Sequence, residues 1–428
     1  MLIVHDAIGY EALGRMLAYQ GWLPYLTTGP NREPLYPLLI AASLHIENMT
    51  GITFLKIMAV FGIIIMFISQ ILMYRILCLL NVRKPICAIV LIYMAISPAL
   101  NNAAFSLFSE IAVFPIVLGI ILSSVHTWKA LYENDHRMTL LNSALLGVLL
   151  VLATLVKAIF ECITPVYLFI LLLSAILKSK KIILPLLGLV IAAGTYYVPI
   201  VSYKWLNLHY NGTFTVTNRG AWLIYGNAVR DTQPMTSKKW GAGLASVAGD
   251  GVCKRFFKPD ECYFWSFQRT DQLGGEKVQE LNRQHLSGTA VNSALVHSSV
   301  KQLAKRPTQF VLLTVLQGLK MFFWESTKIG FVSYPPCLQK IYSSKFFDNT
   351  LRLCMSLLSF FAVLFLWGQG LAGRLQPASY AMGLLIFIYI FFFSFVTILT
   401  RYALPIAPLY LIAIGLWLNQ ILSPKKTN

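Results

Sequence analysis

Five charged side chains in this chain have the types and surroundings that phosphate and proton-transfer chemistry needs. Two are acids, Asp6 and Glu110, and three are cations, Arg32, Lys157 and Arg401. A carboxylate can take a proton from a hydroxyl group, and cations neutralise a phosphate, arginine by a bidentate fork. All five flank long apolar stretches, in a chain in which only 12% of residues are charged. Ionisable groups beside a bilayer are energetically costly, so these residues are candidates for function.

Structural explanations stand beside the functional ones for two of these residues. An acid at the start of a helix, as at Glu110, is also ordinary helix capping. Lys157 lies between two apolar segments, where a lysine commonly extends its amine to the membrane surface. For Arg401 the functional interpretation gains weight, because we expect it outside the cytoplasm, where the positive-inside rule disfavours arginine.

Composition places the chain in a membrane. Of its 428 residues 57% are hydrophobic, and the mean hydropathy is +0.65, whereas soluble domains are about 45–50% apolar. The net charge of +18 is explained mainly by basic cytoplasmic loops and anionic lipid headgroups, with a phosphate-binding site as the sharper alternative. Nucleic acid is an unlikely partner, because the chain has no basic soluble module with interleaved aromatic residues.

Apolar stretches predict an all-α polytopic membrane protein with about 9–10 transmembrane helices and one extracytoplasmic mixed domain. The stretches are 52–77, 85–99, 111–128, 141–156, 159–177, 182–201, 310–324, 351–367, 380–397 and 403–421. We expect three parts: an N-terminal transmembrane catalytic module over 1–201, an extracytoplasmic domain over 202–306, and a C-terminal transmembrane module over 307–428.

Lysine and arginine in short loops set the expected orientation. The basic loops 78–85, 128–140 and 178–181 and the tail Lys425-Lys426 are predicted to be cytoplasmic. External loops 1–50 and 98–110, the turn at Lys157 and the segment 202–306 then share the opposite side. For the C-terminal tail to be cytoplasmic, the stretch 310–324 must not cross the membrane. We therefore expect an interfacial or re-entrant helix there. An external N-terminus requires either a further helix preceding Met1, which we favour, or an N-terminus that crosses the membrane without one.

The segment 202–306 mixes aromatic, polar and glycine residues, which indicates an ordered domain rather than a linker. Cys253 and Cys262 lie nine positions apart within it, and in an oxidising compartment this pair is a candidate disulfide. A helical pattern runs from about 278 to 305 and is closed by Pro307.

Four motifs resemble those of the GT-C glycosyltransferases, in the group of protein O-mannosyltransferases and aminoarabinose transferases. In chain order they are HDAIGYEALGRMLAYQG with REPLYPLLIA, then SLFSEIAVFPI, LGVLLVLATLVKAIFECITPVYL, and RYALPIAPLYLIAIG. The third carries Lys157 where the family usually has arginine, and Asp6 has no acidic neighbour like that of the O-mannosyltransferases.

The resemblance implies roles for these residues in an inverting hexosyl- or pentosyltransferase of the plasma (inner) membrane. Asp6 would be the catalytic carboxylate, and Glu110 would position the acceptor. A divalent metal ion is used by some relatives only, and Asp6 with Glu110 would hold it. The cations, together with the tyrosines of the first and last motifs, would bind substrate phosphate: Arg32, Lys157, Arg401, Tyr10 and Tyr402.

The expected function is transfer of a sugar from a polyprenyl-phosphate donor to a glycolipid, polysaccharide or protein acceptor on the extracytoplasmic face. Two alternatives stay open. One is a non-enzymatic transporter or flippase of lipid-linked sugars or polysaccharide, in which the same charges line a pathway. The other is an inactive, truncated transferase.

Overall fold

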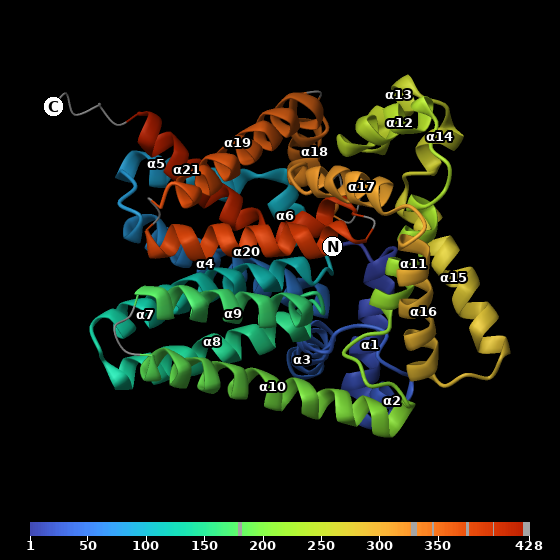
Figure 1. Cartoon of the computed structure of the whole chain (residues 1–428), viewed down its shortest axis with the longest axis horizontal. Helices are drawn as coiled ribbons and strands as arrows, with labels where there is room; N and C mark the ends of the chain where they lie inside the picture. Colours follow the sequence, from blue (N-terminus) through green and yellow to red (C-terminus); the bar gives the residue numbers. More distant parts are fainter. Residues whose placement is uncertain (179–181, 327–331, 345, 374–375, 397, 423–428) are drawn as a thin grey trace.

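Long apolar helices dominate the computed structural model (Figure 1), which describes all residues except 179–181, 327–331, 345, 374–375, 397 and 423–428. Eight helices in the described part are long and apolar enough to cross a bilayer. They are α4 (Phe54–Leu79), α7 (Glu110–Tyr132), α8 (His136–Val156), α9 (Phe160–Lys178), α10 (Ile183–Asn211), α19 (Arg352–Leu371), α20 (Pro377–Ser394) and η3 (Thr400–Ile406) continuing into α21 (Ala407–Ile421). The chain is therefore a multi-pass α-helical membrane protein, as its composition predicts.

A ninth span is present if the bent pair α5 (Lys84–Ile96) and α6 (Pro98–Ala104) is counted as one. The two helices meet at an angle of 57°. The break falls at Ser97-Pro98, because proline cannot donate a backbone hydrogen bond and disfavours helical geometry in the residue before it. Ser97 then caps α6 by accepting a hydrogen bond from the Leu100 backbone N–H at 3.3 Å.

The apolar stretch at 310–324 does not form a membrane-length helix. It contributes to α17 (Pro307–Lys320), which has 14 residues and is about 21 Å long, against about 30 Å of hydrocarbon. The eight candidate spans do not include it. With nine spans, the N-terminal segment, the loop before α7, the turn after α8 and the loop before η3 all fall at one end of the bundle. The tail Lys425-Lys426 and the lysines Lys180 and Lys181 lie outside the described residues.

Three helices precede the first span and lie at that end of the bundle: α1 (Asp6–Tyr19), α2 (Trp22–Thr27) and α3 (Leu35–Thr50). α1 packs so closely on α3 that a side chain at Gly14 would overlap Ile40. Tyr10 and Tyr36 also meet edge to face, with ring centroids 5.1 Å apart. This packing fixes the direction in which the first turn of α1 points.

The segment after α10 forms a unit of six helices outside the helix bundle (the external unit) rather than a mixed domain. They are α11 (Arg219–Asp231), α12 (Ser237–Val247), α13 (Asp250–Phe256), α14 (Pro259–Tyr263), α15 (Phe267–Arg283) and α16 (Gly288–Leu303). The prediction of a mixed domain is not supported, because every regular element described in this segment is a helix. Figure 1 shows α11, α15 and α16 running across one end of the long helices.

Two details of this segment differ from the sequence prediction. α10 continues ten residues beyond the predicted end at 201 and stops at Gly212, whose φ is 73°. The single helix expected over 278–305 is two helices, because the chain turns at His285 with a φ of 55°. Ser287 then caps α16 by accepting from the Ala290 backbone N–H at 3.3 Å.

A disulfide between Cys253 and Cys262 joins α13 to α14. Both sulfurs lie in a small apolar core that includes Trp265 and extends to Leu313 and Leu316 of α17. The external unit is thus attached to the bundle through α17. The remaining short elements are η1 (Trp324–Ser326), α18 (Pro336–Tyr342) and the π-helix η2 (Phe346–Leu351).

Candidate functional site

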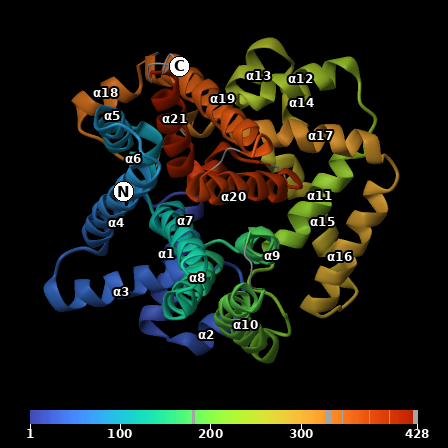
Figure 2. The ribbon, with the colours of Figure 1, turned by 60° about the vertical axis from the view of Figure 1, so that its left-hand side comes forward.

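The charged residues singled out in the sequence lie at the ends of four different elements. Asp6 begins α1, Glu110 begins α7, Lys157 follows the last residue of α8, and Arg401 is in η3. Successive spans run antiparallel, so these termini meet at one end of the bundle. Figure 2 shows α7 and α8 side by side, and Tyr10 of α1 reaches the start of α7 through its hydrogen bond with Ser109. The contacts described next connect all four residues, Arg32, Tyr10 and Tyr402 in one cluster.

Asp6 is held between two arginines. Arg32 Nη2 donates to Asp6 Oδ1 at 2.6 Å, and Arg401 Nη2 donates to Asp6 Oδ2. The three side chains are between 14% and 23% exposed. Burial alone would raise the pKa of Asp6, but the Arg401 and Arg32 guanidiniums outweigh it and hold that pKa well below its usual range. Asp6 is therefore a weak base while both arginines contact it.

Glu110 and Lys157 form a second, deeper ion pair. Lys157 Nζ donates to Glu110 Oε1 at 2.9 Å, and their side chains are 15% and 3% exposed. Burial lowers the pKa of Lys157, but the adjacent Glu110 carboxylate outweighs it and raises that pKa above its usual value. Lys157 thus lies inward on Glu110 instead of extending to the membrane surface. Glu110 also makes more than a capping contact, because it pairs across to the end of α8.

Aromatic rings surround the two ion pairs. Arg32 lies 4.7 Å from the Tyr10 ring centroid, and Arg401 lies 5.0 Å from that of Phe108 and 5.8 Å from that of Tyr402. The Tyr10 hydroxyl is 2.9 Å from the Ser109 hydroxyl, directly beside Glu110. Aromatic rings beside guanidiniums favour the cation without neutralising it, so both arginines keep their full charge.

Three further side chains fix the backbone around the site, and sequence reasoning did not assign them a role. Glu33 Oε1 accepts from the Ala158 backbone N–H at 2.9 Å, which ties the first loop to the Lys157 turn. The Tyr389 hydroxyl donates to the Tyr402 carbonyl at 2.8 Å. Asn227 of the external unit donates to the Phe395 carbonyl at 3.0 Å. Only Glu33 had a sequence signal, its position beside Arg32.

Two polar atoms of the cluster are buried without a hydrogen-bond partner among the described residues: Glu110 Oε2 and Arg401 Nε. Buried polar groups in folded proteins are nearly always paired, so such atoms commonly mark places where a ligand or water binds. With Glu33 included, the cluster holds three carboxylates and three cations. An incoming phosphate must therefore replace a carboxylate on one of the cations or be accompanied by a proton.

The donor set is poorly suited to the divalent metal ion considered for Asp6 and Glu110. Within the described ranges, no three His, Cys, Asp or Glu side chains gather into a possible metal site. Both carboxylates also face cations, Asp6 two arginines and Glu110 a lysine. A divalent ion would have to displace these partners, so no step of the proposed chemistry is assigned to a metal.

The remaining predicted pair, Cys253 and Cys262, is not part of this cluster. Its disulfide belongs to the core shared by α12, α13, α14 and α17. The external unit approaches the cluster elsewhere, where the Phe267 and Tyr402 rings pack with centroids 6.3 Å apart.

Comparison with known proteins finds no match to a protein family, a characterised sequence or a solved structure. The class defined by fold and site is thus a multi-pass helical membrane protein with a buried cluster of paired charges at one end of its bundle. The resemblance to GT-C glycosyltransferases rests on the four motifs alone.

Proposed function

We propose that this protein is an integral-membrane glycosyltransferase of the inverting type. It moves a sugar from a polyprenyl-phosphate donor to a glycolipid, polysaccharide or protein acceptor on the extracytoplasmic face of the plasma (inner) membrane. The observation that carries the proposal is Asp6 held between Arg32 and Arg401 beside the buried Glu110–Lys157 pair. The four GT-C-like motifs contain these five residues in family order, which supports the proposal.

The position of the cluster suits a substrate with a lipid tail and a charged head. The charges lie where apolar spans end, so a polyprenyl chain can stay in the bilayer while its phosphate reaches the protein. Arg32 and Arg401 offer guanidinium forks, which bind phosphate oxygens better than a point charge does. Basic loops at the other end of the bundle favour an extracytoplasmic location for this end.

Exchange of partners on the two arginines links donor binding to catalysis. The donor phosphate takes the place of the Asp6 carboxylate on Arg32 and Arg401, and Asp6 loses the contacts that hold its pKa low. Its pKa then rises toward the range in which a carboxylate accepts a proton. In this way Asp6 becomes an effective base only when a donor is bound.

The chemical step follows from these positions. The acceptor hydroxyl attacks the anomeric carbon, the bond from that carbon to the phosphate oxygen breaks, and Asp6 takes the hydroxyl proton. Polyprenyl phosphate leaves with the bonding electrons, and its developing charge is stabilised by Arg32 and Arg401. Glu110, held by Lys157, has its free Oε2 available to orient the acceptor.

The distribution of charge favours an enzyme over a transporter. A transport pathway needs polar groups near mid-membrane on several helices. The five residues of this cluster instead lie at helix ends or in the connections between helices.

The test measures sugar transfer in membranes that contain the full chain. Radiolabelled polyprenyl-phosphate sugars are supplied, and label in endogenous acceptors is compared for wild type, Asp6→Asn and the control Glu11→Gln. Glu11 lies on the same helix but pairs with the exposed Arg15. Loss of a general base lowers rates by about 10²–10⁴-fold, so we expect Asp6→Asn to abolish measurable transfer. Glu11→Gln should transfer as wild type does. Undiminished transfer by Asp6→Asn in normally inserted protein would remove Asp6 from catalysis and refute the mechanism.

A further inference from the structure

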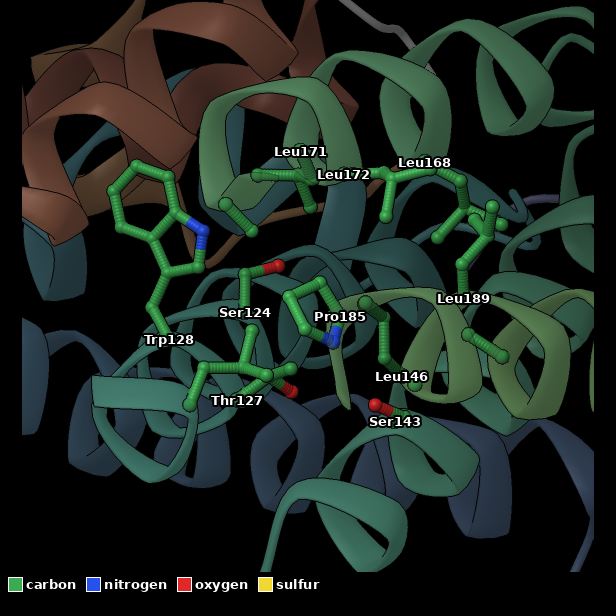
Figure 3. A pocket seen from close by; sticks show the side chains of 14 residues that line it. Ser124, Thr127, Trp128, Ser143, Leu146, Leu168, Leu171, Leu172, Pro185 and Leu189 are labelled. Atoms are coloured by element: carbon green, nitrogen blue, oxygen red, sulfur yellow. The ribbon is translucent and has the colours of Figure 1, made fainter. Parts of the chain in front are cut away.

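A cavity among four spans lies far from the charged cluster. It is small, about 40 Å³ in volume, and is lined by residues of α7, α8, α9 and α10. Figure 3 shows Leu168, Leu171 and Leu172 of α9 along one side, with Ser124, Thr127 and Trp128 of α7 on the other. The remaining lining is largely leucine, alanine, glycine and proline.

The cavity belongs to the end of the bundle opposite the charged cluster. Glu110 begins α7, and the first lining residue of that helix is Ser124, which a rise of about 1.5 Å per residue places about 21 Å further along the axis. The lining parts of α9 and α10 are about the last three turns of the former and the first three of the latter. A ligand here is therefore out of reach of Asp6 and Glu110.

Two of the three hydroxyl groups in the wall, those of Ser124 and Thr127, form hydrogen bonds within the protein. Ser124 Oγ donates to the Ile120 carbonyl at 2.8 Å and lies 3.0 Å from the Tyr167 hydroxyl. Thr127 Oγ1 donates to the Ser123 carbonyl at 2.9 Å. A polar ligand would find few free partners, whereas an apolar chain fills the space without leaving a polar group unpaired.

The surroundings of the cavity are those of a lipid site. Leu173 of α9 and Leu186 and Leu187 of α10 are exposed on the outer faces of the two helices, so lipid-facing surface continues from the cavity wall. Trp128 at one end stacks on Tyr380, with centroids 5.3 Å apart. Tryptophan and tyrosine concentrate at headgroup depth in membrane proteins, which places this end of the cavity near the membrane surface.

We propose that one acyl chain of a membrane phospholipid, from the leaflet at this end of the bundle, lies along this surface with a short part of its length in the cavity. The cations Lys129, directly after Trp128, and Arg137, in the first turn of α8, lie at the same end and suit the lipid phosphate. A polyprenyl donor fits this position less well than a phospholipid does, because its phosphate would lie at the charged cluster, at the opposite end of the bundle. The site is independent of the proposed transferase activity.

The test maps lipid contacts in the full chain by photolabelling. The protein is reconstituted into vesicles of phosphatidylethanolamine and phosphatidylglycerol that contain a tracer phosphatidylethanolamine with a diazirine on its acyl chain. Labelled residues are located by peptide mass spectrometry. Two variants receive the same enlarged side chain at adjacent positions: Leu172→Trp fills the cavity, and Leu173→Trp changes only the outer face.

We expect wild type to be labelled at inward-facing residues such as Leu172 and Ala175 as well as on the outer face. Leu172→Trp should lower the inward labelling by about tenfold, a change of about 1.4 kcal/mol in binding, and Leu173→Trp should leave it unchanged. Labelling of wild type on outer residues alone would overturn the proposal even if Leu172→Trp fails to fold. Loss of inward labelling on addition of polyprenyl phosphate would also overturn it, because the occupant would then be an isoprenoid chain.

Discussion

The buried pair of Lys157 and Glu110 makes a quantitative prediction about stability. The change Lys157→Gln removes the cation from a carboxylate that is 3% exposed and whose second oxygen already lacks a partner. Removing one partner of a buried ion pair costs about 3–5 kcal/mol, because the remaining charge stays desolvated and unpaired. Replacing both partners with neutral residues removes that cost, so Lys157→Gln with Glu110→Gln should be within about 1 kcal/mol of wild type.

The assay is unfolding in mixed micelles that contain increasing amounts of a denaturing detergent, monitored by tryptophan fluorescence. A matched control is Lys129→Gln, which breaks a 3.8 Å pair with Glu133 whose side chains are 70% and 58% exposed. Exposed pairs contribute less than about 1 kcal/mol, so this control should unfold nearly as wild type does. If Lys157→Gln costs no more than the control, or if the double variant is as unstable as Lys157→Gln alone, the buried pair does not exist as described.

The remaining predictions concern the external unit and α17, on which it packs. Replacing Cys253 and Cys262 with serine should lower the free energy of unfolding by about 2–3 kcal/mol, the stabilisation expected from a cross-link that closes a loop of this length. It should also expose α12–α14 to proteolysis, and unchanged protease resistance would contradict this. Burial and the Arg230 charge lower the pKa of Lys320 to about 8, so the unfolded state binds one more proton between about pH 8 and pH 10.5. Its destabilising contribution is fully present below pH 8 and is relieved as pH rises, so stability should increase by up to about 1.4 kcal/mol per pH unit there. Lys320→Met should remove that slope, and a slope that persists in the variant would assign it to another group.

Much of the bundle could be predicted from composition, because about twenty consecutive apolar residues have few alternatives to a membrane helix. The short α17 is an informative case. Its apolar residues alone permit a span, and the alternation of basic loops indicated that 310–324 does not cross. The Ser97-Pro98 break was likewise visible in the sequence.

Features that depend on packing between distant residues were not predictable. The external segment looked like a mixed domain because it contains many aromatic residues and glycines. In the structure these glycines allow close helix contacts, as where a side chain at Gly243 would overlap the ring of Trp265. The turn at His285 divides a continuous helical pattern, and the local signal for it is the Ser287-Gly288 pair that follows.

The candidate site was likewise predictable only in part. Residue type and position between apolar stretches identified the acids and cations, but not which of them pair. Asp6 lies 26 and 395 positions from its two arginines, and no local pattern relates residues at such separations. The hydrogen bond from the Ala158 backbone N–H to Glu33 was also missed. Its partners lie 125 positions apart, and the donor is a backbone group that nearly every residue carries.

The Asp6–Arg401 contact has a consequence for biosynthesis. A ribosome makes Asp6 hundreds of residues before Arg401, which stands at the start of the last span. Until that span is inserted, the growing chain can hold Asp6 with Arg32 alone. The cluster can therefore form only as the last event of membrane insertion, and a chain halted before residue 401 would contain most of the bundle without its site.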